Sequence, residues 1–585
     1  MAIPICVGWA LGDMSAGLMG ATGGFTSLYG SGRPYPHRAR LLAAVAVAFA
    51  AAVGLGKAVA GVPLWVVPTV AVIAMLSTWL GNALRLGPPG AYLFMLACAA
   101  GTAMPAPHIS AGQAFVYVLG GGLLAWCVHM AGAAVAPRGP ERAAVSQAAV
   151  AVGQFLDLTD DAARAPARQR AALALHDAWH ALNSFQPAWA PHSERLNALR
   201  AATAQLHQCF AHANAGAAAS EGWRAAAQVR VATLAAGQWP NAVEVEHNAV
   251  PLRHPGLAAA ARQALAPGTA SRQVIVRVGV AAAVAGVLGA LTGLERAYWA
   301  VAAAVLMLHQ GMDWARTVQR SVERTVGTWL GLVLAGAILW WSPHGLWLAV
   351  VIGLLQFAVE MLVLRNYALA AIFITAAGMT LASGGQPVAS LPHFLWARGV
   401  DTLVGCAVAL VTLRLMPTRP APATVASQLQ RALRAQAQLL RAMAGHTLGT
   451  ASGWEARSEL SCAGFALSVS EEVALWGCRV AKPGQLVWWP AVAAVQQLSY
   501  RLLSAAWVLE NDAALDAPAT ALAGMRDPVA VAHLATELEN AAQALQAQRA
   551  VHLAYDALPA YVAADVRAVF DGLSGITAAA ASTRG

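Results

Sequence analysis

Two acidic residues lie deep inside long apolar stretches of the sequence, where a carboxyl group could exchange protons or bind a partner. Asp13 lies about eight residues into the stretch 5–29, and Asp401 about nine residues into the stretch 392–416. If these stretches are helices that cross a membrane, both carboxyl groups are expected roughly 12–14 Å from the outer face. Ionisable groups at such depth are costly and usually face a cavity, a partner or the interface.

The two carboxyl groups differ in their sequence neighbours. Arg398 precedes Asp401 by three residues, so on a helix the two side chains share a face and can neutralise each other. This pair fits either a buried tether between helices or a role in proton coupling or substrate binding. Asp13 has no cation nearby, so it is expected either to accept a proton reversibly or to make a polar packing contact.

A row of arginines precedes another apolar stretch, in the segment "RTVQRSVERTVGTWLG". Arg316, Arg320 and Arg324 recur at four-residue intervals, which places them on one face of a helix. Two roles can be superposed on them: an orientation signal, which needs only charge, and a mouth that attracts anions, which needs geometry. Gly327 and Gly331 continue the same segment as a small-residue stripe, which predicts close packing of a second helix.

Three further side chains could take part in transport. Glu360 lies near the inner end of an apolar stretch and is expected at the membrane interface or in a substrate pathway. Tyr298 and Trp299 lie near the expected outer side, together with several other tryptophans. They fit an aromatic belt at the membrane surface or a stacking surface for aromatic acids.

A pair of histidines has the spacing of metal ligands. In "LHDAWHAL", His176 and His180 are one helical turn apart. The sequence shows no third ligand, so we expect solvated histidines on a helix and no metal site. The seven cysteines form no C-x-x-C pair and are expected to be reduced thiols. No Walker sequence and no G-x-S-x-G turn appears, so neither a cofactor nor an enzymatic activity is expected.

The composition requires a membrane. The chain has 585 residues, of which 58% are hydrophobic and 11% charged, against about 25% charged in soluble domains. Its net charge of +9 does not indicate nucleic-acid binding, because lysine occurs only at positions 57 and 482 and no basic stripe with aromatic residues appears.

Apolar stretches occur in two groups, which divide the chain into four blocks. The expected spans of the first half (1–136) and of the second half (272–416) are 5–29, 39–61, 63–84, 90–105 and 112–136, and then 273–293, 296–312, 325–341, 345–364, 367–384 and 392–416. The blocks 137–271 and 417–585 are amphipathic at helical period and are expected to be soluble helical domains. The predicted fold is therefore an all-α membrane protein with about five plus six spans.

Arginine-rich connections predict the orientation, because short loops rich in Lys and Arg stay in the cytoplasm. Both soluble domains should then be cytoplasmic, and the connection 383–393 should lie outside. Five spans with a cytoplasmic exit would place Met1 outside. If the halves are repeats, 5–29 corresponds to 296–312, and the first half lacks its first helix, either through a start codon placed too far downstream or through loss of that helix.

The second half resembles the family of fusaric acid resistance proteins and aromatic acid exporters. The resemblance rests on three stretches, "ERAYWAVAAAVLMLHQGMDWARTVQRSVERTVGTWLG", "RNYALAAIFITAAG" and "ARGVDTLVGCAVALVTLRLMP", which lie between residues 295 and 417. The alternation of membrane halves and soluble domains is similar as well.

The resemblance implies an inner-membrane, multi-pass efflux transporter of small aromatic or hydroxy carboxylic acids, driven by proton antiport. A passive organic-anion channel of the malate-channel type and an envelope scaffold without transport are the alternatives. The expected partners are a small organic anion and the lipid bilayer, with no nucleic acid, and a homo-oligomer is compatible with this interpretation. The sequence does not specify the substrate.

Overall fold

A computed structural model describes most of the chain. The residues outside the description are 85, 88, 104–106, 159–160, 185–193, 215–220, 240–256, 268, 292–297, 313, 364, 384–387, 389, 418–420, 479–487, 511–521, 523, 555–556 and 583–585. The chain forms two units. The membrane unit contains 1–31, 35–137 and 255–418, and the second unit, which we call the soluble unit after the expectation from its sequence, contains 32–34, 138–254 and 419–585.

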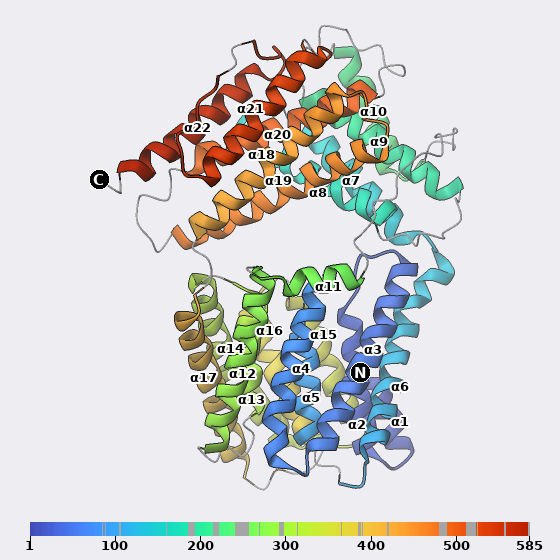
Figure 1. Ribbon diagram of the computed structural model, residues 1–585. Helices are drawn as coiled ribbons and strands as arrows, with labels where there is room; N and C mark the ends of the chain where they lie inside the picture. The colour runs from blue at the N-terminus through green and yellow to red at the C-terminus, as the bar shows by residue number, and fades with distance from the viewer. Residues whose placement is uncertain are drawn as a thin grey trace. The chain divides into compact units, whose positions relative to one another are not determined.

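The membrane unit is a bundle of helices that run side by side (Figure 1). Its first segment contains α1 (Ala2–Ala10), α2 (Met14–Gly23), the 3-10 helix η1 (Gly24–Leu28), α3 (Tyr35–Val59), α4 (Pro63–Ala83), α5 (Tyr92–Ala103) and α6 (Ala111–Val135). Its second segment contains α11 (Leu257–Leu265), α12 (Ala270–Leu291), α13 (Tyr298–Leu308), α14 (Trp314–Trp341), α15 (Leu346–Leu362), α16 (Tyr367–Ala382) and α17 (Leu391–Leu415).

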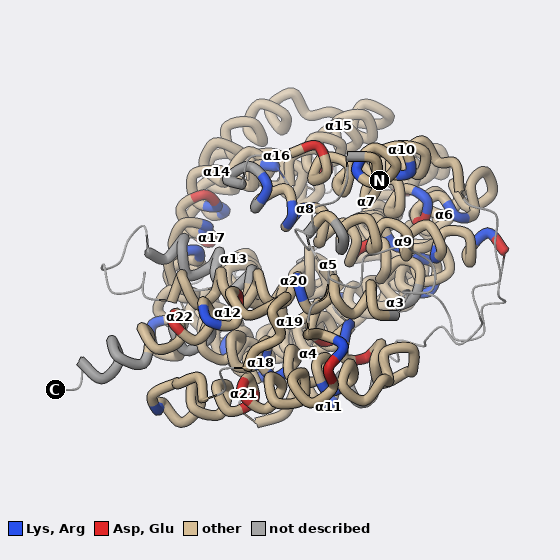
Figure 2. Tube along the Cα trace, turned by 90° about the horizontal axis from the view of Figure 1, so that it is seen from above, with Lys and Arg blue, Asp and Glu red and all other residues tan. Residues whose placement is uncertain are grey.

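Six of these helices are long and apolar enough to cross a membrane, namely α3, α4, α6, α12, α14 and α17. Shorter apolar helices, α5, α13, α15 and α16, accompany them. The part of the chain that the structure describes contains no β-strand. The prediction of an all-α membrane protein is confirmed. Figure 2 shows that Lys, Arg, Asp and Glu are sparse along the trace.

The predicted continuous span 5–29 is wrong, because the chain turns at residues 11–13. α1 ends at Ala10, Gly12 has a φ of +78°, and α2 begins at Met14. α1 and α2 pack against each other so closely that a Cβ on Gly8 would come within 2.6 Å of the Cα of Gly17. The segment is therefore a helical hairpin with a polar turn.

The same helix pairings occur in both membrane segments. α3 packs against α5 and α6, as α14 packs against α16 and α17, and α2 packs against α1 and α6, as α13 packs against α12 and α17. Across the segments, α4 packs against α12 and α15 packs against α1. The nine-residue α1 thus packs as the 22-residue α12 does, and the expectation of a first half without its first helix stays a prediction. An internal repeat stays a prediction, which this pattern supports.

The predicted small-residue stripe is the contact between α14 and α16. A Cβ added to Gly327 would lie 2.6 Å from Ala371 Cβ, and one added to Gly331 would lie 2.6 Å from the carbonyl oxygen of Ile372. Both glycines are buried. The absence of side chains at these two positions therefore sets the spacing between the two helices.

The soluble unit is helical and is formed by two parts of the chain. The first part contains α7 (Gly139–Asp157), α8 (Asp161–Trp179), the π-helical turn η2 (His180–Ser184), α9 (Glu194–Asn214) and α10 (Glu221–Ala235). The second part contains α18 (Ala421–Ala444), α19 (Ala451–Cys478), α20 (Trp489–Glu510), α21 (Pro528–Gln546) and α22 (Ala563–Ser582). α9 packs against α20, so the two parts share a core. α11, which the sequence pattern placed in the first soluble block, packs against α4 in the membrane unit.

Candidate anion site

The three arginines predicted to share a helical face all lie on α14. Arg316 and Arg320 are half-buried, whereas Arg324 is only 2% exposed. Arg320 lies over the ring of Tyr367, 4.1 Å from its centroid. The row of charge therefore runs from the end of α14 into the interior of the membrane unit.

A second buried arginine lies near the inner end of this row of arginines. Arg398 on α17 is 3% exposed and interacts electrostatically with Arg324. The hydroxyl of Tyr92, on α5, lies within electrostatic range of both guanidinium groups. Helices from both membrane segments thus surround a pair of buried cations.

Arg398 is held by neighbours other than its expected carboxylate. Its Nη1 donates a hydrogen bond of 2.7 Å to Thr402 Oγ1, and its guanidinium lies 4.0 Å from the centroid of the Trp299 ring. Asp401 is 1% exposed, and neither of its carboxylate oxygens accepts a hydrogen bond from the described residues. The expected mutual neutralisation of Arg398 and Asp401 is thus electrostatic, without a hydrogen-bonded ion pair.

The cluster has hydrogen-bond donors without described acceptors, and it has a net positive charge. Nε and Nη1 of Arg324 are buried without a hydrogen-bond acceptor among the described residues, as is the hydroxyl of Thr328 one turn later. Unmade hydrogen bonds of buried groups are costly and uncommon, and a bound ligand or water usually supplies the missing partner. Two guanidinium groups and one carboxylate, Asp401, leave a formal charge of +1. This arrangement can bind a small anion.

Asp13 does not lie within a continuous helix, so its predicted depth is wrong. It is the N-cap of α2, where its Oδ1 accepts a hydrogen bond of 2.9 Å from the backbone N–H of Ala16. Its Oδ2 lies 3.5 Å from Nε2 of His108, and its side chain is 36% exposed. Asp13 therefore has a local structural role at the polar turn and is not a counterpart of Asp401.

The remaining candidates divide between the interior and the surface. Trp299 is 8% exposed and lies against Arg398, so the belt interpretation does not hold for it. Tyr298 is half-buried beside it, with ring centroids 5.0 Å apart. Glu360 is exposed and accepts hydrogen bonds from Ser27 and Gln356. Neither of these described contacts involves the arginine cluster.

Sequence reasoning missed part of the cluster. Tyr92 was not singled out, because nothing in "GAYLFMLACAAG" separates it from an ordinary core tyrosine. Tyr367 and Thr402 belong to the stretches that carry the family resemblance but were not assigned to the site. Thr402 could have been found, since it lies four residues after Arg398, within reach on a helix.

The helices that carry the cluster belong to a region that matches a known family. Residues 281–412 match the family described as fusaric acid resistance protein-like. The family resemblance is confirmed over this segment. This fusaric acid resistance-like region contains α13 to α16 and most of α17, and therefore Arg324, Arg398 and Asp401.

One relative extends the comparison to most of the chain, and a second matches a shorter stretch. The chain is 26% identical over 544 residues to an uncharacterized membrane protein, YvaC, of Bacillus subtilis, with 86% of this chain and 83% of the relative covered. It is 35% identical over 144 residues to an uncharacterized protein, slr1298, of Synechocystis, with 23% of this chain and 18% of that protein covered. No solved structure matches the chain.

Proposed function

We propose that the protein exports small carboxylic acids across the inner membrane and that the buried pair Arg324 and Arg398 binds the carboxylate. The observation that carries this proposal is the cationic cluster itself. A guanidinium donates charge-assisted hydrogen bonds to a carboxylate, and Nε and Nη1 of Arg324 are two buried donors without an acceptor among the described residues. One carboxylate would neutralise the formal charge of the cluster.

The surrounding rings favour aromatic or hydroxy acids as the substrate class. Trp299 lies against the guanidinium of Arg398, and Tyr92 and Tyr367 interact electrostatically with that of Arg324. Their ring faces and edges suit a planar ligand. A tyrosine hydroxyl also provides a donor and an acceptor for a substrate hydroxyl.

Proton antiport is the proposed driving force, with Asp401 as the proton carrier. A carboxyl group inside a membrane bundle that accepts no hydrogen bond is the kind of group found in proton relays. A passive organic-anion channel would use the same arginines without needing Asp401. An envelope scaffold would need neither.

The three readings predict different fluxes in proteoliposomes that contain the full chain. We expect an acidic lumen to drive uptake of aromatic or hydroxy carboxylates into liposomes in which the outer face of the protein lines the lumen. Arg324→Gln and Arg398→Gln should each reduce uptake at least about tenfold, whereas Arg414→Gln, an exposed arginine on the same helix as Arg398, should not. Flux that does not depend on the proton gradient would favour the passive channel. Absence of flux for every acid tested would favour the scaffold without transport.

The proposed orientation places the soluble unit in the cytoplasm. In a cysteine-free background, a single cysteine at Val388 should react with an impermeant maleimide in intact cells. One at the exposed His446 should react only after the cells are opened. The reverse labelling pattern would show that the protein has the opposite orientation in the membrane, which would exclude export as proposed.

A further inference from the structure

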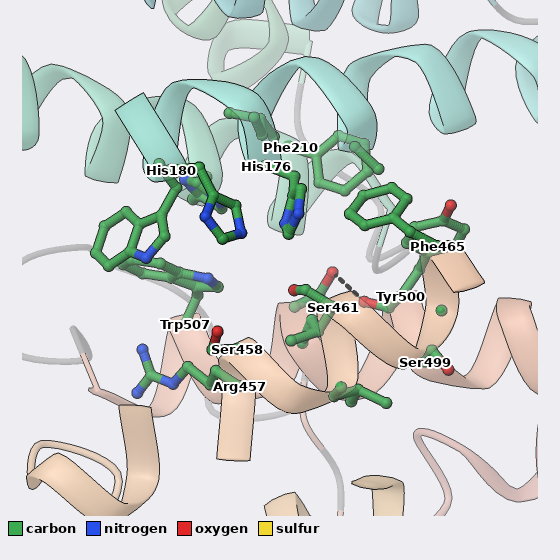
Figure 3. Close-up of a pocket in the computed structure, with 18 of the residues that line it drawn as sticks. His176, His180, Phe210, Arg457, Ser458, Ser461, Phe465, Ser499, Tyr500 and Trp507 are labelled. Carbon is green, nitrogen blue, oxygen red and sulfur yellow. Dashed lines mark hydrogen bonds between the residues drawn. The ribbon is translucent and has the colours of Figure 1, made fainter. Parts of the chain in front are cut away.

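A cavity of about 90 Å³ lies within the soluble unit, between helices from its two parts. α8, η2 and α9 form one side, and α19 and α20 form the other (Figure 3). Trp179 stacks on Trp454 at 5.4 Å, and His176 lies 4.4 Å from the ring of Phe465, so the cavity joins the two parts through aromatic contacts. The expectation that His176 is a solvated helix histidine is therefore wrong.

The two histidines point into this cavity side by side. Their ring centroids are 4.2 Å apart, and Figure 3 shows both rings directed toward the helix that carries Ser458 and Ser461. His180 is the first residue of the π-helical turn η2, and such turns are frequent at functional sites. The helix therefore changes from α to π geometry at His180, the residue that carries the second imidazole.

The fold adds the third donor that the sequence did not reveal. Cys462, on α19, is not in a disulfide, and its Sγ lies with ring nitrogens of His176 and His180 such that all three atoms are within 4.8 Å of one another. Donors of a tetrahedral zinc site are separated by about 3.3–3.8 Å, given zinc–nitrogen distances of about 2.0 Å and zinc–sulfur distances of about 2.3 Å. Side-chain rotations that bring the donors about 1 Å closer would complete the geometry.

We propose that His176, His180 and Cys462 bind a zinc ion. Two imidazoles and a thiolate suit Zn²⁺, whereas Mg²⁺ and Ca²⁺ prefer carboxylate and carbonyl oxygens. Three protein ligands leave a fourth position for water or a ligand, on the side where the two histidines line the cavity. The ion would connect α8 and η2 to α19 and thereby stabilise the packing of the two parts of the soluble unit. This site is independent of the proposed transport function.

Cobalt is the probe that tests the donor set directly. After treatment with a chelator, the purified full chain in detergent should bind one Co²⁺ and show the visible absorption of a tetrahedral site together with a thiolate-to-cobalt charge-transfer band. Cys462→Ser should remove the charge-transfer band. Cys127→Ser, an exposed cysteine outside this unit, should keep it. Absence of the thiolate band in the parent protein would overturn the proposal whatever the variants do.

Zinc affinity and stability provide the second measurement. Competition with a chromophoric chelator should show that His176→Gln, His180→Gln and Cys462→Ser each weaken Zn²⁺ binding at least about tenfold. Added Zn²⁺ should raise the midpoint of thermal unfolding of the parent and leave that of Cys462→Ser unchanged. Equal zinc binding by parent and variants would exclude these residues as ligands. Binding of Cu(I) without Zn²⁺ would overturn the assignment of the metal.

Discussion

The guanidinium group of Arg398 lies over the indole ring of Trp299, 4.0 Å from the ring centroid, with both side chains buried in the membrane unit. A cation–π contact at a desolvated site contributes about 2 kcal/mol. The ring therefore holds a buried charge in place where water cannot solvate it. Thr402, which accepts a hydrogen bond from Arg398 Nη1, is the other described contact that holds this guanidinium.

Replacing Trp299 should disturb the anion site without removing a charge. We expect Trp299→Leu to raise the half-saturating substrate concentration by roughly 30-fold, the equivalent of about 2 kcal/mol. Trp299→Phe, which keeps a ring face, should have a smaller effect. Uptake measured over a range of substrate concentrations separates this change from a loss of protein. An unchanged half-saturating concentration in Trp299→Leu would mean that the stacked arginine does not bind substrate.

Asp13 and Asp401 should respond differently to the same substitution. Asn is as good an N-cap as Asp, so Asp13→Asn should fold and transport like the parent, whereas Asp13→Ala should lose about 1 kcal/mol of stability. Asp401→Asn should abolish proton-driven uptake while the membrane yield stays near normal. Comparing yield with acid-driven flux for all three variants is the test. If Asp401→Asn still transports against a gradient, Asp401 is only a tether.

Gly331 should not tolerate a side chain. A Cβ there would lie 2.6 Å from the carbonyl oxygen of Ile372, so Gly331→Leu must push α16 away and should cost about 1–3 kcal/mol or more. Leu332 is buried and is a poor control, whereas Val333 on the same helix is 73% exposed. Val333→Leu should therefore fold normally. Equal amounts of folded protein for both variants, measured by fluorescence-detected size exclusion, would show that α14 and α16 separate without cost.

Two cavity histidines should make the soluble unit sensitive to acid. Burial lowers the pKa of His176 to about 3, helped by His180 and His207, and lowers the pKa of His207 to about 4. In the unfolded chain both have a pKa near 6.5, so below that pH the unfolded state binds more protons than the folded state. The stability of the metal-free protein should be full above about pH 6.5 and fall by up to about 1.4 kcal/mol per pH unit for each histidine as the pH approaches 4.

His207 provides the variant for this measurement. His207→Gln should reduce the dependence of the unfolding free energy on pH in the same window, because one of the two titrating groups is gone. Denaturant unfolding of the full chain, followed by tryptophan fluorescence at several pH values with chelator present, gives the slope. An identical slope in parent and variant would mean that His207 is protonated in the folded state.

Much of the membrane unit could be predicted because lipid imposes strong rules on sequence. Long apolar stretches gave most of the helices, and the four-residue spacing of Arg316, Arg320 and Arg324 placed them on one helix. The hairpin at the start of the chain was missed because hydrophobicity alone does not register a turn. The signal was present in "LGDMSAG", where Gly12 can adopt a positive φ and Asp13 can cap the next helix.

Contacts between distant parts of the chain could not be predicted from one sequence. Arg324 and Arg398 lie on different helices, and no local pattern states that they approach each other. Cys462 likewise lies far along the sequence from His176 and His180, so the sequence alone offers the histidine pair no third ligand, and only the fold brings α19 beside α8. The prediction of helices depended on periodicity, whereas these sites depend on tertiary packing.

α14 is one uninterrupted helix of 28 residues, about 42 Å long, without an internal proline. It carries the arginine row on its first half and the tight glycine contact with α16 on its second half. A helix of this kind moves as a rigid rod, so a displacement along the α16 contact transfers Arg316, Arg320 and Arg324 by the same distance. Sliding by four residues would carry each arginine about 6 Å, to the level its neighbour held before, and thus mechanical motion and charge translocation would be a single event.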